Sequence, residues 1–218
     1  MVICILWMFA MLLAVKVLAA WLESPSRKGK SGERTVANRL RQGLPKEYII
    51  LNDVYLPLAD GTTTQIDHIV VSQYGIFVVE TKNYSGWIFG NENSAQWTQS
   101  IYGKKSRFQN PLRQNHLHIC TLSERTRIDR SYFHSVVAFT GECTFKTEMP
   151  ANVVYSRRAA DYIRSFTTPR IRVSQVAEVA AAIQSWDDAV GEEQRAAHVD
   201  NLRQRHAAVR AGDAPRRG

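Results

Sequence analysis

Cysteine is scarce in this chain of 218 residues, which contains only three. Cys4 lies in an apolar N-terminal run, and Cys120 and Cys143 have no partner at the spacing of metal ligands. The sequence therefore predicts neither a disulfide framework nor a zinc ribbon. An internal repeat is also absent. His116 and His118 are two residues apart on a predicted helix, which places them on different faces and makes them poor candidates for a metal-binding pair.

Acidic residues are the minority among the charges: 20 Asp and Glu stand against 28 Lys and Arg, a formal charge of +8. This imbalance favours a polyanionic partner, either nucleic acid or an anionic lipid surface. A nucleic-acid strand could contact the basic segment that contains Lys104, Lys105 and Arg107, where Tyr102 and Phe108 could stack on bases. A solvated loop explains the same segment equally well.

One long apolar run is present, at residues 2–22, with Lys16 as its only charge. At about 1.5 Å per residue it reaches the roughly 30 Å of a bilayer core, so we expect a single transmembrane helix. No Lys or Arg precedes it, unlike a signal peptide, although cleavage after Ala20 is an alternative. A basic linker at 23–31 follows. The positive-inside rule then predicts a single-pass protein of the cell membrane with its body in the cytoplasm.

The rest of the chain divides into a domain at 32–187 and a basic tail at 188–218. The first part is long enough for one domain with a proper core. The tail has little to bury, and we expect a solvated or frayed helix followed by disorder. Within the domain, patterning predicts helices at 33–44, 111–125, 157–166 and 174–186, strands at 48–56, 65–72, 75–82 and 133–140, and short strands at 87–89 and 153–155.

Three charges interrupt two consecutive apolar strands: Asp67 in the first, and Glu80 and Lys82 in the second. A hairpin with residues 73–74 at its tip places Asp67 directly opposite Glu80. Facing carboxylates repel each other unless something positive lies between them, so a divalent cation is expected there. Lys82 follows Glu80 by two residues and therefore lies on the same face of the sheet.

Such a cluster suits hydrolysis of a phosphodiester, with Mg2+, or alternatively Mn2+, held by oxygen ligands and polarising the phosphate. Lys82 would orient or help to deprotonate the attacking water, or neutralise charge on the phosphate. A surface hairpin with ordinary solvated salt bridges is the alternative. The flanking residues argue against it, because they predict two covered faces: Ile66, Val70, Phe77 and Val79 on one, and Ile69, Val71, Ile76 and Val78 on the other.

The arrangement of an acid followed by Glu-x-Lys on the next strand resembles the PD-(D/E)xK nuclease superfamily, and the surrounding residues resemble its nuclease-related domain (NERD) branch. The resemblance covers roughly residues 31–140 and is implied by a combination of segments: Gly32-Glu33, Gln65-Ile66-Asp67-His68, Gly75-Ile76-Phe77, Val79-Glu80-Thr81-Lys82-Asn83-Tyr84, Gly86-Trp87-Ile88-Phe89-Gly90, Trp97 and Asn110-Pro111-Leu112-Arg113-Gln114-Asn115. It implies an α/β, restriction-endonuclease-like fold, in which helices flank a mixed β-sheet core.

The resemblance also implies roles for individual residues. Glu33, Asp67 and Glu80 would bind the metal, Lys82 would be the catalytic lysine, and Gln114 would be a polar helix residue facing the site. Glu33 is predicted in the first turn of a helix, where the macrodipole favours an acid in any case. Gln114 could be a surface amide. His68 would point to the opposite face from Asp67, as a packed or hydrogen-bonded histidine.

These patterns together predict a membrane-anchored, metal-dependent nuclease that acts on DNA or, as the less favoured substrate, RNA. Two other interpretations stay open. The domain could bind nucleic acid without cutting it, or it could be a membrane-tethered scaffold that recruits a protein partner.

Overall fold

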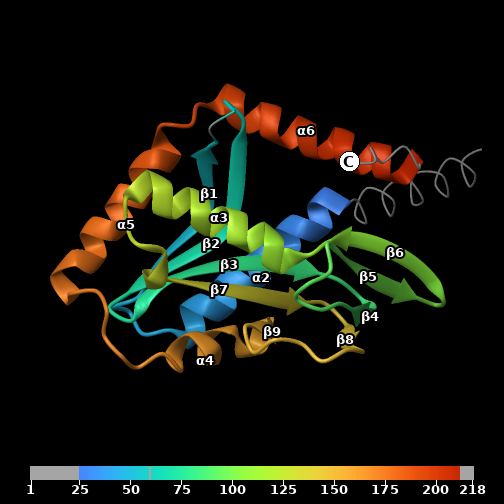
Figure 1. The fold of residues 1–218 in the computed structure, drawn as a ribbon, viewed down its shortest axis with the longest axis horizontal. Coiled ribbons are helices and arrows are strands. Elements are labelled where there is room, and N and C mark those ends of the chain that lie inside the picture. Colours follow the sequence, from blue (N-terminus) through green and yellow to red (C-terminus); the bar gives the residue numbers. More distant parts are fainter. Residues whose placement is uncertain (1–24, 59, 212–218) are drawn as a thin grey trace, which may run out of the picture.

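A computed structural model describes residues 25–58 and 60–211 (Figure 1). The transmembrane helix predicted at 2–22 lies outside these residues, as does the disorder expected at the end of the tail, 212–218. Within the described ranges, no helix combines the length and the apolar character that crossing a bilayer requires.

A five-stranded mixed sheet forms the centre of the fold, in the order β1-β2-β3-β7-β9. The first three strands are antiparallel, as a meander, whereas β7 is parallel to β3 and β9 is parallel to β7. The mixed α/β core agrees with the restriction-endonuclease-like fold that was expected. The bounds are β1 Ile49–Pro57, β2 Thr63–Ser72, β3 Gly75–Asn83, β7 Phe133–Thr140 and β9 Val153–Tyr155.

A second, four-stranded sheet has the order β6-β5-β4-β8. Its strands are β4 Gly86–Phe89, β5 Gln96–Ile101, β6 Lys104–Gln109 and β8 Cys143–Phe145. Only β4 was predicted, because β6 is exposed along most of its length and carries no apolar alternation. Tyr102 and Gly103 connect β5 to β6 with φ angles of 47° and 79°. Positive φ at both positions is typical of a two-residue hairpin turn.

Helices cover both faces of the central sheet. In Figure 1, α3 (Pro111–Thr126) crosses in front of the sheet and α2 (Pro25–Gly43) lies behind it. The α2 side buries Val36 and Leu40 against Val70, Phe77 and Val79. The other side buries Ile69, Val71, Ile76 and Val78 against α3 and α5 (Val173–Asp188). The remaining helical elements are η1 Arg130–Tyr132, η2 Ser156–Arg158, α4 Ala159–Arg164 and α6 Glu192–Ala211.

The predicted assignment of faces is wrong at one residue. Ile66 packs with Val54 and Leu56 in the cluster below α3 and α5, not with Val70. Ile66 pairs with Val54, and the preceding residue of β1, Asp53, has a φ of 59°. The regular alternation of the strand is interrupted there, which two-residue periodicity cannot anticipate.

The helix α2 begins at Pro25, eight residues before the predicted start, so most of the segment expected as a linker at 23–31 is helical. Proline is tolerated in a first turn. Tertiary contacts then hold the helix, because Asn83 Nδ2 donates a hydrogen bond to the carbonyl of Lys28 at 2.7 Å. A Cβ at Gly32 would lie 2.7 Å from Asn83 Cβ, so glycine permits this close approach.

The helix α6 was predicted as solvated or frayed, and its first turns are in fact attached to the domain. Arg195 donates to Asp187 Oδ1 at 2.8 Å, and its guanidinium lies over the ring of Tyr55. His198 Nδ1 lies 2.8 Å from the carbonyl of Thr63. These polar contacts, which carry no hydrophobic signature in the sequence, place α6 beside the ends of β1 and β2 (Figure 1).

Candidate active site

The hairpin of β2 and β3 has the predicted register. Pairing runs from Ser72–Gly75 to His68–Val79, and continuing it by one residue brings Asp67 to Glu80. Beyond the last ladder pair, the backbone N–H of Thr81 donates to Asp67 Oδ2 at 2.7 Å. The Asp67 carboxylate is therefore fixed beside the strand that carries Glu80 and Lys82.

The side chains of Glu80 and Lys82 form an ion pair between the sheet and α3. Lys82 Nζ lies 2.7 Å from Glu80 Oε1, and it also donates to Gln114 Oε1 at 3.0 Å. The side chain of Glu80 is 3% exposed and that of Lys82 is 16% exposed. A solvated surface salt bridge does not have this burial, so the structure contradicts that alternative. Gln114 likewise faces the cluster and is not a free surface amide.

Two buried asparagines place α3, and thereby Gln114, over the sheet. Asn110 caps the helix by accepting from the N–H of Leu112, and its Nδ2 donates to three backbone carbonyls of the segment 91–94. Asn115 Nδ2 donates to the carbonyl of Val78 at 2.7 Å and to Ser135 Oγ at 2.8 Å. These bonds attach the helix to both β3 and β7.

The electrostatics of the cluster follow from three crowded carboxylates. Burial, followed by the charges of Glu80 and Glu33, raises the pKa of Asp67 well above its usual value. Burial also acts to lower the pKa of Lys82, but the neighbouring Glu80 carboxylate outweighs it and the pKa is raised. Without a bound cation the site therefore combines a protonated lysine with acids that resist ionisation together.

Glu33 lies on α2, yet its carboxylate belongs to this cluster. Burial and then Asp53 raise its pKa, with further contributions from Glu80 and Lys82. The prediction that Glu33 occupies a first turn is wrong, because α2 begins at Pro25 and its first turn contains no acid. The helix macrodipole consequently does not account for an acid at this position.

Sequence analysis missed His118, which is buried beneath Glu80. His118 Nδ1 lies 3.7 Å from Glu80 Oε2, and burial lowers the pKa of the imidazole. The available signal was spacing, since His118 follows Gln114 by four residues and therefore shares its face of α3. His116 is exposed, which confirms that the two histidines lie on different faces.

His68 is a packed histidine, as predicted. Its Nδ1 lies 2.9 Å from Asn52 Oδ1, and burial lowers its pKa to about 4. It is therefore neutral at physiological pH.

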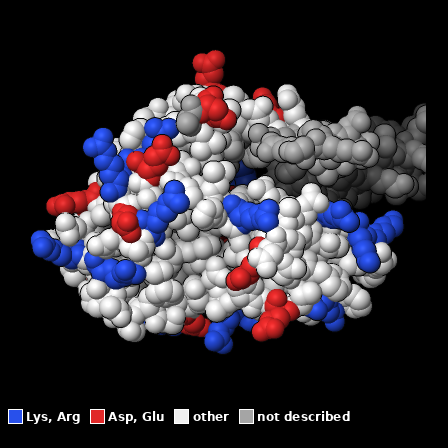
Figure 2. Space-filling view, in the orientation of Figure 1, with Lys and Arg blue, Asp and Glu red and all other residues white. Residues whose placement is uncertain are grey.

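The basic residues expected to contact nucleic acid lie on β6, one strand of the hairpin β5–β6. Lys104, Lys105 and Arg107, the β6 basic triad, are all exposed. Figure 2 shows Lys and Arg side chains over the end of the molecule where this hairpin lies. Tyr102 at the turn is fully exposed. The expectation for Phe108 is wrong, because its ring packs on Tyr84, 4.5 Å between centroids, and is not free to stack on a base.

The residues of the cluster fit a cation with few protein ligands. No group of three or more His, Cys, Asp and Glu side chains within residues 25–58 and 60–211 is arranged to hold a metal ion. Mg2+, however, is commonly bound by one or two carboxylates and keeps several waters. Glu80 Oε2 is buried and has no hydrogen-bond partner among the described residues. A buried anionic oxygen without a partner is typical of a position that an ion or water completes.

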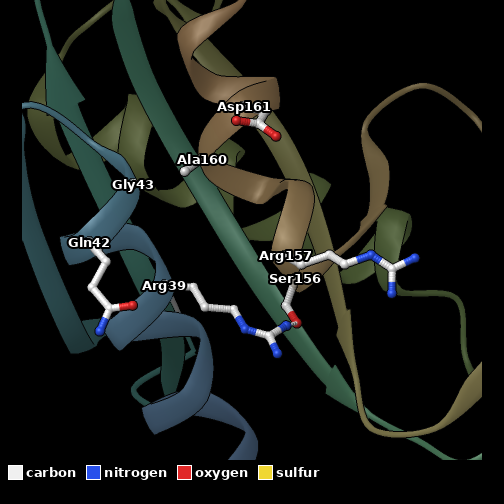
Figure 3. A pocket seen from close by; sticks show the side chains of 7 residues that line it. All are labelled: Arg39, Gln42, Gly43, Ser156, Arg157, Ala160 and Asp161. Atoms are coloured by element: carbon white, nitrogen blue, oxygen red, sulfur yellow. Dashed lines mark hydrogen bonds between the residues drawn. The ribbon is translucent and has the colours of Figure 1, made fainter.

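A surface recess elsewhere on the domain contains none of these residues. It lies between α2 and the η2–α4 segment, where Arg39 reaches toward Ser156 and donates to its hydroxyl (Figure 3). Gly43 and Ala160 approach closely at one side of it. The candidate chemistry is therefore confined to the cluster between β2, β3, α2 and α3.

Comparisons with known proteins agree with the geometry of this cluster. The family model described as a nuclease-related domain matches residues 28–140, which include Glu33, Asp67, Glu80, Lys82 and Gln114. A protein of Bacillus anthracis, described as uncharacterized, is 40% identical over 159 residues, 71% of this chain and 74% of that protein. No solved structure matches the chain. The family match spans more than half of the chain, and this chain belongs to the nuclease-related domain family.

Proposed function

We propose that the domain is a metal-dependent nuclease that hydrolyses phosphodiester bonds of DNA, with RNA as the less favoured substrate. The observation that carries this proposal is the contact set of Lys82. Its ammonium is held by Glu80 on one side and Gln114 on the other, with Asp67 fixed beside them. Side chains from two strands and a helix thus converge on one small, mostly buried volume, which a structural role alone does not require.

Asp67 and Glu80, with Glu33 near them, are the residues that would hold Mg2+ or Mn2+. The ion would polarise the phosphate and acidify a bound water. Lys82 is protonated, since its pKa is raised, so it neutralises charge that develops on the phosphate oxygens or orients the attacking water. Gln114 fixes the direction of the ammonium. Asp67 is in turn fixed by the N–H of Thr81, which limits its motion during the reaction.

The β6 basic triad is the surface that we propose for substrate binding. Its side chains are exposed on a hairpin with an exposed Tyr102 at the turn, a combination that can contact phosphates and stack on a base. The formal charge of +8 supports attraction of a polyanion. Phosphate contacts of this kind position a strand without selecting its sequence.

Membrane attachment is a further part of the proposal. It is supported by the apolar run at residues 2–22 and by the basic residues that follow it. With the positive-inside rule, the anchor would place the nuclease domain at the cytoplasmic side of the cell membrane. Because α2 begins at Pro25, little chain would separate the anchor from the domain.

The experiment is cleavage of labelled single- and double-stranded DNA and RNA by the full chain, with Mg2+, Mn2+ or EDTA. We expect cutting that needs the metal and is abolished by EDTA. Binding that is indifferent to metal, without cutting of any substrate, would contradict the proposal and support a nucleic-acid-binding module instead.

A further inference from the structure

Two buried donor atoms in the cluster have no hydrogen-bond partner among the described residues, and they face each other. They are Glu80 Oε2 and His118 Nδ1, 3.7 Å apart. Both side chains are almost fully buried, at 3% and 2% exposed. A buried polar atom without a partner costs about 1–3 kcal/mol, and more for a charged group, so two adjacent ones need an explanation.

A direct hydrogen bond does not explain the pair, because 3.7 Å exceeds the N–H···O range of about 2.7–3.2 Å. The separation does suit a shared ion. Divalent metals bind oxygen and nitrogen ligands at about 2.0–2.2 Å, so two ligands of one ion lie about 3 Å apart at right angles and little more than 4 Å apart when opposite. The observed distance falls between these limits, and no large movement of either side chain is required.

We propose that His118 is a ligand of the metal ion that Glu80 binds, and that its nitrogen makes the site prefer Mn2+ to Mg2+. This inference rests on the proposed metal dependence of the domain. Mg2+ is bound almost entirely by oxygen, whereas imidazole nitrogen suits first-row transition metals. Burial keeps the imidazole neutral, which is the form that binds metal.

The position of His118 on α3 explains how the ligand is oriented. Gln114 lies one turn earlier on the same face and contacts Lys82, which pairs with the other oxygen of Glu80. The helix therefore approaches both oxygens of one carboxylate, with an amide acting through Lys82 on Oε1 and the imidazole facing Oε2. Asn115, between them, attaches this turn of the helix to the sheet.

The test is pulsed electron paramagnetic resonance of the full chain loaded with Mn2+, which detects a directly bound nitrogen as modulation of the spin echo. We expect nitrogen modulation in the wild type and in His116→Gln, a matched control because His116 is an exposed histidine of the same helix. It should be absent in His118→Gln. Mn2+ affinity should fall about tenfold or more in His118→Gln, while Mg2+ affinity changes less.

Three outcomes would overturn the inference: wild type that binds Mn2+ without nitrogen modulation, modulation that persists in His118→Gln, or wild type that does not bind Mn2+. The wild-type spectrum alone decides the matter if His118→Gln fails to fold. Failure of the proposed function is distinguishable. Metal-dependent cleavage without nitrogen modulation refutes only the role of His118, and nitrogen-bound Mn2+ without cleavage refutes only the nuclease.

Discussion

Replacing Asn115 by alanine should lower the free energy of unfolding by about 2 kcal/mol. Its Nδ2 reaches three acceptors, the carbonyls of Val78 and Val136 and the hydroxyl of Ser135, but it carries only two hydrogens. Two bonds at a net value of about 1 kcal/mol each give the estimate. Asn115 Oδ1 is buried without a partner among the described residues, so its removal costs nothing further.

The aspartate variant makes the test sharper. Asn115→Asp keeps the shape of the side chain but replaces the donor by an oxygen that faces other oxygens. A buried charge without a partner costs about 3–5 kcal/mol, so this variant should be the less stable of the two. Urea denaturation measures both, and His116→Ala, at the exposed neighbour, should lie within about 0.5 kcal/mol of wild type. Asn115→Ala as stable as that control, or Asn115→Asp as stable as Asn115→Ala, would refute the argument that donation from Nδ2 attaches α3 to the sheet.

Three further predictions concern α2, the metal and the substrate. Gly32→Ala should destabilise the fold by about 1–3 kcal/mol, because its Cβ would lie 2.7 Å from Asn83 Cβ, whereas Gly29→Ala, with 3.7 Å to its nearest neighbour, should stabilise α2 by up to about 1 kcal/mol in thermal or urea unfolding. The raised pKa of Asp67 means that the folded state binds its proton more tightly than the unfolded chain does, so metal-free stability falls as the pH rises through that pKa. Asp67→Asn should therefore melt higher than wild type at neutral pH without metal, yet gain less from Mg2+ or Mn2+, and an equal gain in both would count against a shared metal site. Neutralising the β6 basic triad should reduce the salt dependence of DNA binding by about 0.9 in log–log slope per lost phosphate contact, whereas changing Arg158 and Arg164, which pair with Asp161, should leave the slope unchanged.

Sequence patterning was sufficient for the hairpin that carries the acids. A short connection between two apolar strands fixes the register, so the proximity of Asp67 and Glu80 followed from counting residues. The burial of these charges followed as well, from the apolar residues on both sides of them. The helix-borne residues depended on the family resemblance, because no local pattern states which residue of a helix faces a distant strand.

Features held by polar or steric contacts were not predictable in the same way. The early start of α2 depends on contacts of Asn83 with Lys28 and Gly32, which lie more than fifty residues away in the chain. The attachment of α6 depends on Arg195 meeting Asp187 and Tyr55. Hairpin β5–β6 has a polar, exposed strand, and its formation depends on pairing with β4. In each case tertiary contacts override a weak local preference.

The central claim is that the ammonium of Lys82 acts on the phosphate, and it is tested most directly by a matched pair of lysine variants. The rate of a single turnover of the preferred substrate should be measured at saturating metal for wild type, Lys82→Met and Lys105→Met. Loss of a positioned catalytic group costs about a factor of 100 or more, so we expect a fall of that size for Lys82→Met, with no change in melting temperature large enough to explain it. Lys105→Met, on the exposed hairpin, should weaken substrate binding but leave the rate at saturation nearly unchanged. Equal rates for wild type and Lys82→Met would contradict the account.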